Sequence, residues 1–287
     1  MEHNGLEPNA LYLVATPIGN LSDLSHRAEE VLRMADFIAA EDTRHTLKLL
    51  NHLGIKKPMV SYFEHNKRER GLIITDRIAA GQTCALVTDA GTPAISDPGE
   101  DIVALCAQQG IRVIPIPGPC AFVQALIVSG LSTKRFAFEG FLSVSKTARK
   151  EHLQKIKEDE HTLVFYEAPH KLATTLQDLY QALGDRKIAL VRELTKIHEE
   201  VVRTTLSQAA ERYREEKPKG EFVLVVEGYV PPAEEASASR ETVVAKVHQL
   251  IEEGLDQKEA TKQAALFFHL PKRQVYRYLL EEKEPSR

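Results

Sequence analysis

Short apolar runs alternate with helical patterns over the first part of the chain. Runs such as Leu11–Ala15, Phe37–Ala40 and Cys84–Val87 are brief and are bounded by Gly, Pro or Asp, which is typical of buried strands. Segments between them, such as Leu24–Ala35 and Asp101–Gln109, carry apolar residues at helical spacing. This alternation predicts a mostly parallel sheet with helices on both faces.

The pattern changes after the proline-rich segment Pro115–Pro119. Further strands are predicted at Phe136–Phe141, Leu163–Tyr166, Ile188–Val191, Val201–Thr205 and Phe222–Val226. The third and fourth of these follow one another with no helix between them. The second half therefore predicts a mixed sheet rather than a second parallel one.

The last part of the chain is predicted to be helical. Residues 231–239 have a linker composition, rich in Pro, Ala, Ser and Glu. The helical patterns Glu241–Glu253, Lys258–Phe268 and Lys272–Glu282 follow, and the last two resemble a helix-turn-helix. We expect an α/β domain over residues 1–117, a second over 118–230, a linker over 231–239 and a helical, helix-turn-helix-like tail over 240–287.

Composition narrows the class of protein. The 287 residues are 43% hydrophobic and 27% charged, with a net charge of −4, which is ordinary for a soluble globular protein. No apolar run approaches the roughly 20 residues of a membrane helix, and the start of the chain lacks the order of a signal peptide. Three widely spaced cysteines argue against a disulfide framework. We expect a cytoplasmic enzyme or binding protein with no membrane partner.

Three loops that follow predicted strands point to one ligand cleft. Thr16–Leu21 holds a single glycine and lacks the glycine-rich pattern of a phosphate site, so a dinucleotide or nucleoside triphosphate is disfavoured. Thr88–Gly99 holds two glycines, two prolines and two aspartates, which suits a cationic or hydroxyl-rich ligand. The alternative is a structural turn in which Asp97 caps the next helix. The third loop is Pro117–Ala121.

Polar residues also follow strands of the second half, in Tyr166–Lys171 and Arg192–Glu200. The four residues His170, His198, Glu199 and Glu200 lack the spacing of metal ligands, so no metal site is predicted.

These segments, in this order, resemble the tetrapyrrole methylase superfamily of S-adenosylmethionine-dependent methyltransferases. The motifs that carry the resemblance are Leu13–Leu21, Ala40–Arg44, Glu64–Asn66, Asp89–Gly99, Pro117–Pro119, Tyr166–His170, Arg192–Lys196 and Lys219–Phe222. Within the superfamily, the chain is similar to the enzymes that methylate the 2′-hydroxyl of a cytidine ribose in small-subunit (16S) ribosomal RNA. Cys120 and Lys171 stand where the pattern has Ser and Arg, and neither change alters the assignment.

The resemblance implies two α/β domains with the cofactor cleft between them, a homodimer, and S-adenosylmethionine as cofactor. That ligand has no phosphate and carries a cationic sulfonium, which agrees with the loops above. The residues implied to hold it are Pro17, Asp89, Gly91, Thr92, Pro93, Ile95, Ser96, Asp97, Gly118, Cys120, Ala121, Ala168, Pro169, Leu194 and Gly220.

Methyl transfer to a ribose hydroxyl benefits from a base that takes the hydroxyl proton. The predicted catalytic residues are Glu167, Arg192, Glu193 and Lys196. The alternative for each is an ion pair that links the strands of the second sheet.

Local basic segments predict contacts with 16S rRNA in the small ribosomal subunit, although the net charge is acidic. The residues are Lys67, Arg68, Arg70, Lys146, Arg149, Lys150, Lys272, Arg273 and Arg277. Solvated faces and a ligand-free helical module are the alternatives. Two other functions stay open: a tetrapyrrole (precorrin-type) methyltransferase, and a non-enzymatic DNA-binding regulator whose cleft senses a metabolite.

Overall fold

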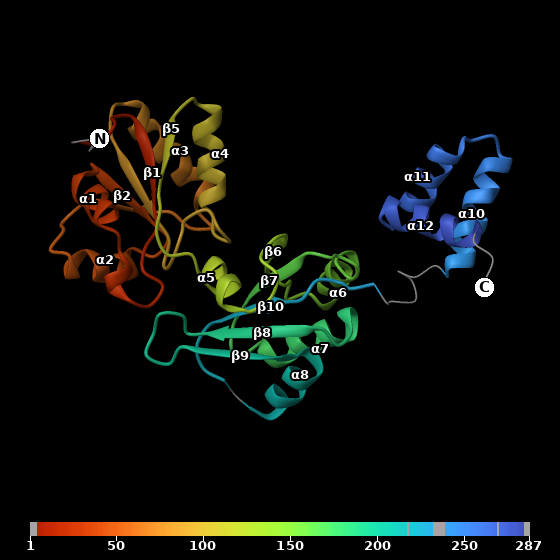
Figure 1. The fold of residues 1–287 in the computed structure, drawn as a ribbon. Helices are drawn as coiled ribbons and strands as arrows, with labels where there is room; N and C mark the ends of the chain where they lie inside the picture. Colours follow the sequence, from red (N-terminus) through yellow and green to blue (C-terminus); the bar gives the residue numbers. More distant parts are fainter. Residues whose placement is uncertain (1–4, 217, 232–238, 269, 284–287) are drawn as a thin grey trace. The chain divides into compact units, whose positions relative to one another are not determined.

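The computed structural model describes residues 5–216, 218–231, 239–268 and 270–283. It divides into two compact units, the first ending at Tyr229 and the second beginning at Val230 (Figure 1). The first unit holds two five-stranded sheets, so the domain boundary expected near residue 117 stays a prediction. Most of the expected linker, residues 232–238, lies outside the described residues. No helix in the described part of the chain is long and apolar enough to cross a membrane.

The first sheet is parallel and has the order β3-β2-β4-β1-β5. Its strands are β1 (Ala10–Val14), β2 (Phe37–Ala40), β3 (Met59–Ser61), β4 (Cys84–Val87) and β5 (Arg112–Ile116). Helices α1 (His26–Met34) and α2 (Thr43–His52) cover one face, and α3 (Lys67–Ala79) and α4 (Gly99–Gln108) cover the other. A short 3₁₀ helix, η1 (Leu21–Asp23), precedes α1. The parallel, doubly covered sheet predicted from the sequence is confirmed.

The second sheet is mixed, as predicted, and has the order β6-β7-β10-β8-β9. Its strands are β6 (Phe136–Phe141), β7 (Thr162–Glu167), β8 (Lys187–Arg192), β9 (Glu200–Thr205) and β10 (Phe222–Val226). Only β6 and β7 run parallel, and β8 and β9 form a hairpin. Helices α6 (Lys146–Lys155), α7 (Leu172–Leu183) and α8 (Leu206–Glu215) bury one face, and α5 (Ala121–Val128) packs on the other.

Strand order brings the predicted loops of the first sheet together. Because β1 lies between β4 and β5, the loops after these three strands share one edge. The loop after β1 also contacts the turn after β8: a Cβ added at Gly19 would lie 2.4 Å from Cγ of Lys196. The carboxyl ends of strands from both sheets therefore face a common space.

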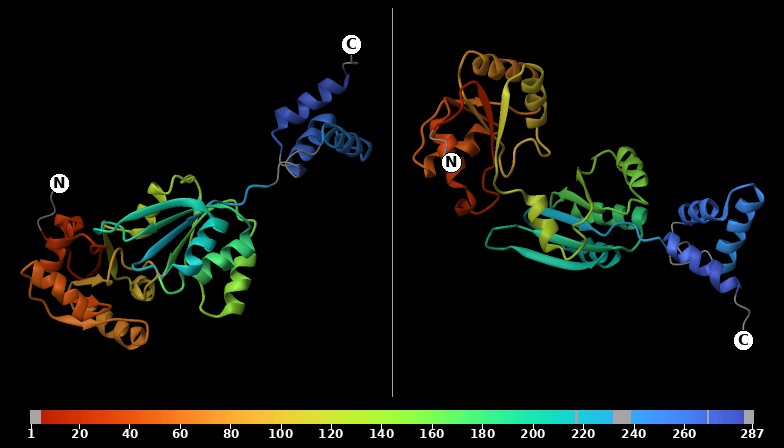
Figure 2. Two further views of the ribbon diagram at one scale, coloured as in Figure 1. Left: turned by 90° about the horizontal axis from the view of Figure 1, so that it is seen from below. Right: turned by 45° about the horizontal axis from the view of Figure 1, so that its top comes forward.

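The second unit is a three-helix bundle (Figure 2). Its helices are α10 (Arg240–Glu252), α11 (Gln257–Phe267) and α12 (Lys272–Lys283). Val243, Val247, Ala260, Ala264 and Val275 are fully buried in its core. The predicted helical tail is confirmed.

Candidate active site

Hydrogen bonds join the loops after β1, β4 and β5. Thr16 and Gly91 exchange a pair of N–H to carbonyl bonds of 2.9 and 3.0 Å. The hydroxyl of Thr92 donates to the carbonyl of Pro119 at 2.9 Å. The protein's own hydrogen bonds therefore hold the three loops together without a ligand.

Asp97 organises the loop before α4. Its carboxylate accepts N–H groups from Ala94, Ile95 and Gly99 at 3.0, 3.3 and 2.7 Å. Ala94 and Ser96 have φ values of 67° and 62°, a left-handed conformation that costs energy for residues with a Cβ. The three bonds to Asp97 stabilise this strained path, and burial raises the pKa of the Asp97 carboxyl.

A second group of carboxylates lies where β2 and β4 end. Glu41 accepts the hydroxyl of Thr88 at 2.5 Å, and Asp89 accepts the N–H of Asp42 at 3.1 Å. Burial and the nearby charge of Glu41 raise the pKa of Asp89. This side of the site is negative, which favours a cationic ligand.

The end of β7 contributes Tyr166 and Glu167. The buried Glu167 carboxylate accepts the N–H of Ala168 at 2.8 Å and the hydroxyl of Thr175 at 2.5 Å. The Tyr166 oxygen accepts the N–H of Phe122 at 3.2 Å, and burial raises the pKa of Tyr166 to about 12. Both side chains are therefore held in place by local bonds.

The turn after β8 places Glu193 beside Lys196. Glu193 has a φ of 51°, and its Oε1 accepts the Lys196 ammonium at 2.9 Å and the N–H of Glu221 at 3.0 Å. Burial opposes ionisation of Glu193, but these two donors outweigh it and hold its pKa below the usual value. Burial likewise opposes the charge of Lys196, but the carboxylates of Glu193 and Glu221 raise its pKa. The pair is charged at neutral pH.

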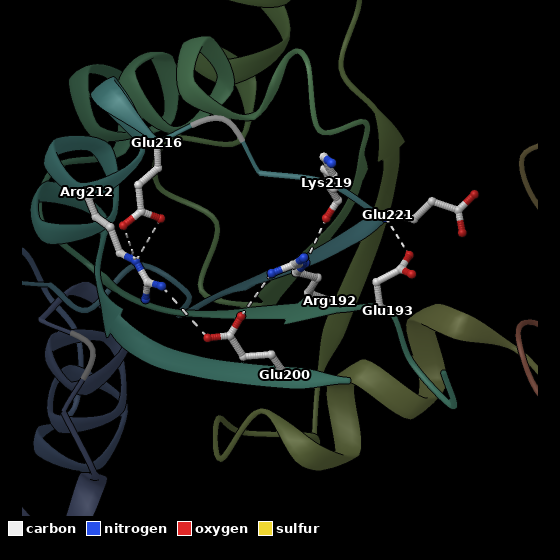
Figure 3. Close-up of polar contacts among 7 residues, drawn as sticks. All are labelled: Arg192, Glu193, Glu200, Arg212, Glu216, Lys219 and Glu221. Atoms are coloured by element: carbon white, nitrogen blue, oxygen red, sulfur yellow. Dashed lines mark hydrogen bonds and ion pairs between the residues drawn. The ribbon is translucent and has the colours of Figure 1, made fainter. Parts of the chain in front are cut away.

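The Arg192 guanidinium points toward Lys219 and Glu200, whereas the Glu193 carboxylate points toward Glu221 (Figure 3). Its Nε donates to the carbonyl of Lys219 at 2.7 Å, and its guanidinium lies 3.5 Å from Glu200. Glu200 in turn lies 3.8 Å from Arg212. Arg192 therefore connects the β8–β9 hairpin to the segment before β10 rather than entering the cavity.

A cavity of about 650 Å³ opens between these elements of the first unit. That volume is in the range of small-molecule sites. Predicted residues that line it are Asp89, Gly91, Thr92, Ile95, Ser96, Asp97, Cys120, Ala121, Glu167, Ala168, Pro169, Glu193, Leu194 and Lys196. Five of the residues predicted to be catalytic or to hold the cofactor are not in its lining: Pro17, Pro93, Gly118, Arg192 and Gly220. Two of these are glycines that allow a close approach of neighbouring residues. A Cβ added at Gly118 would collide with Ala15, and one added at Gly220 would collide with Glu193.

The cavity also contains residues that the sequence did not single out as site residues. They are Ile18, Glu41, Thr88, Ala90, Phe141, Tyr166, His170, Val191, Glu221, Phe222 and Val223. Glu41 directly follows the predicted strand Phe37–Ala40, and a polar residue at the carboxyl end of a parallel strand could have been predicted to line a ligand site. Phe141 is the last residue of β6 and is 57% exposed. The pattern of apolar residues in the sequence does not distinguish it from an ordinary strand residue.

The residues predicted to contact RNA divide into two groups. Lys67 pairs with Glu64 and Asp101, and Arg149 pairs with Asp178 at 2.6 Å, so their charges are neutralised within the protein. The remainder are exposed: Arg68, Arg70, Lys146 and Lys150 in the first unit, and Lys272, Arg273 and Arg277 on α12, where Arg277 also lies 3.7 Å from Glu281. Among the described residues, no group of three or more His, Cys, Asp or Glu side chains is arranged to hold a metal ion.

The chain matches the family of Tetrapyrrole (Corrin/Porphyrin) Methylases over residues 10–210, and it belongs to that family. The superfamily inferred from the sequence motifs is confirmed.

Similarity to individual proteins extends over nearly the whole chain. The protein is 49% identical over 272 residues to "Ribosomal RNA small subunit methyltransferase I" of Synechocystis sp., covering 94% of this chain and 97% of that one. It is 48% identical over 278 residues to the protein of the same name from Halalkalibacterium halodurans, covering 96% of each.

A solved structure shares the fold. Uroporphyrin-III C-methyl transferase from Thermus thermophilus, complexed with S-adenosyl homocysteine, superimposes with a TM-score of 0.54 at 18% identity. The match covers 75% of this chain and 96% of that one.

Proposed function

We propose that the protein methylates the ribose 2′-oxygen of a cytidine in 16S ribosomal RNA, with S-adenosylmethionine as methyl donor. The observation that carries the proposal is the acidic cavity of about 650 Å³, built without a phosphate-binding loop, in a chain of this family. Near-full-length relatives named for methylation of small-subunit rRNA support the choice of substrate. A ribosomal substrate also agrees with the expected cytoplasmic location.

The residues present fit the donor. Its sulfonium is cationic, and the carboxylates of Glu41 and Asp89 place negative charge on one side of the cavity. Backbone groups of the Asp97-organised loop, together with Cys120 and Ala121, are available for its polar substituents. Ala168, Pro169 and Leu194 would contact it from the second sheet. The bound donor supplies an electrophilic methyl group.

The acceptor is positioned and deprotonated by the turn after β8. Oε1 of Glu193 is engaged by Lys196 and Glu221, whereas Oε2 has no hydrogen-bond partner among the described residues. We assign Glu193 as the acceptor of the 2′-hydroxyl proton during attack on the methyl carbon. The Lys196 ammonium orients that carboxylate, and alignment of the reacting atoms supplies much of the rate.

A second copy of the chain completes the proposal. Helix α5 packs Ala125 and Leu126 against the second sheet, while Val123 and Ile127 on its other side are 38% and 61% exposed. An apolar face of this kind supports the homodimer implied by the family resemblance. Ile127→Glu is expected to yield monomers in light scattering; an unchanged dimer would exclude this face.

The proposed function is tested with the purified full-length chain, labelled S-adenosylmethionine and small ribosomal subunits that lack the modification. We expect label in 16S rRNA at one cytidine, in a linkage that blocks alkaline cleavage at that nucleotide. Glu193→Gln should still bind the donor and transfer little label. Label on a base, or transfer to a tetrapyrrole and none to rRNA, would overturn the proposal.

A further inference from the structure

A second, smaller cavity lies beside the first. It has a volume of about 170 Å³ and is lined by α2 together with residues of the loops after β1 and β4. Thr88 and Asp89 line both cavities. A group bound in the second cavity would therefore be adjacent to one bound in the first.

One side of this cavity is an exposed, cationic face of α2. His45, Lys48 and His52 are three and four residues apart, which places them along one side of the helix. All three are exposed, and none of their side chains makes a hydrogen bond or ion pair with another described residue. His45 is close enough to Asp89 to lower the pKa of that carboxyl against the effects of burial and Glu41.

The sequence around α2 adds to this charge. From Thr43 to Phe63 there is no Asp or Glu, whereas the same stretch holds Arg44, Lys48, Lys56 and Lys57. Only Arg44 is neutralised locally, through its 2.8 Å ion pair with Asp42. The residues predicted from the sequence to contact RNA include none from this segment.

The two cavities differ in charge. Carboxylates in the lining of the first belong to Glu41, Asp89, Asp97, Glu167, Glu193 and Glu221, against the single ammonium of Lys196. A phosphodiester would be repelled there. The α2 cavity has one carboxylate, that of Asp89, and offers an ammonium and two imidazoles.

We infer that the α2 cavity binds the phosphodiester backbone of the acceptor RNA next to the target nucleotide. The inference rests on the proposed function, because it requires an RNA acceptor. The ribose then enters the first cavity while its charged backbone stays on the α2 face. Lys48 contributes a point charge, and the two imidazoles contribute hydrogen-bond donors to phosphate oxygens.

The salt dependence of RNA binding tests this inference. Each phosphate contact that is lost lowers the slope of log K against log salt by about 0.7 to 0.9. We expect Lys48→Ala to lower the slope for a 16S rRNA transcript by about that amount. Its KM for unmodified small subunits should rise several-fold, with donor affinity unchanged. Lys48→Glu should have a larger effect in the same direction.

Lys187→Ala is the matched control, because Lys187 is an exposed lysine that begins β8 and pairs with Glu227. It should keep both the parental slope and the parental KM. If the parental protein methylates rRNA but Lys48→Ala behaves like Lys187→Ala, the inference is wrong and the proposed function stands. If the parental protein methylates no rRNA, the proposed function itself fails.

Discussion

The carboxylate of Glu193 fills the space beside Gly220 that a side chain there would need. A Cβ added at Gly220 would lie 2.5 Å from Cδ of Glu193 and 2.6 Å from its Oε1. Gly220 also has a φ of 88°, which L residues rarely adopt. The glycine thus allows Glu193 to reach both Lys196 and the N–H of Glu221.

Gly220→Ala should therefore displace Glu193 and break its bond to Lys196. We expect kcat for methyl transfer to fall by at least about tenfold, within the range of lost acid–base catalysis. Gly184→Ala is the control, because Gly184 has a φ of 80° and nothing within 4 Å of its added Cβ. It should cost about 1–3 kcal/mol of stability, because its φ of 80° and ψ of −171° belong to a region that is essentially restricted to glycine, and it should leave kcat unchanged. Equal losses of kcat in both variants would contradict this account.

The Glu193–Lys196 pair should stabilise the fold only in a middle range of pH. The pKa of Glu193 lies below its usual 4.5, so its contribution is present above that value and is lost as the pH falls through the lowered pKa. The pKa of Lys196 lies above its usual 10.5, so its contribution is lost as the pH rises through the raised value.

Urea unfolding of the parental protein and of Glu193→Gln measures this effect. The difference in unfolding free energy should be about 1 kcal/mol near pH 7, because the pair is partly exposed. It should shrink in acid as Glu193 becomes protonated. A difference that stays constant from pH 7 down to pH 3 would show that the pair contributes nothing as a charged pair.

Asp97 should affect donor binding through the loop that it holds. Asp97→Ala leaves the N–H groups of Ala94, Ile95 and Gly99 without their acceptor. We expect a stability loss of about 1–3 kcal/mol and at least tenfold weaker donor binding by calorimetry. Asp97→Asn should be intermediate, because its remaining oxygen can still accept from Ala94 and Gly99.

Asp36→Ala provides the comparison for Asp97. The Asp36 carboxylate accepts the N–H and the hydroxyl of Thr83 just before β2 and β4 begin, at the opposite end of the strands from the cavity. This variant should lose stability and keep its donor affinity. Donor affinity that is unchanged in Asp97→Ala would remove the loop from the donor site.

The fold was predictable because its strands are buried on both faces. A run such as Cys84–Val87 has no polar position, and that is the pattern of a central parallel strand. The mixed second sheet followed from the absence of a helix between β8 and β9. The edges of elements were less well defined, because residues such as Glu200 at the start of β9 are polar yet paired in the sheet.

The loops that form the site could be predicted from the sequence, but the role of each side chain within them could not. Parallel strand order places Asp89, Asp97 and Cys120 at one edge, whatever their side chains do. The sequence offers backbone capping by Asp97 only as an alternative to ligand binding, and it gives no sign that the Glu167 carboxylate binds the N–H of Ala168. It also does not show which of the adjacent residues Arg192 and Glu193 enters the cavity, because that depends on strand alternation and on the left-handed turn at Glu193.

Arg192 should act as a positioning residue through the backbone of Lys219. Its bond to that carbonyl holds the segment before β10 in place. In the same segment, Gly220 leaves room for the Glu193 carboxylate and the N–H of Glu221 donates to it. Arg192→Met should lower kcat by about tenfold while the KM for the donor changes little. Arg192→Lys should recover part of kcat, because an ammonium can donate to the carbonyl but cannot also reach Glu200 as a planar guanidinium does.

Arg212→Met removes a more distant member of the same network and should leave kcat unchanged. Parental kcat in Arg192→Met, or an equal loss in Arg212→Met, would show that the network supports only the stability of the second sheet.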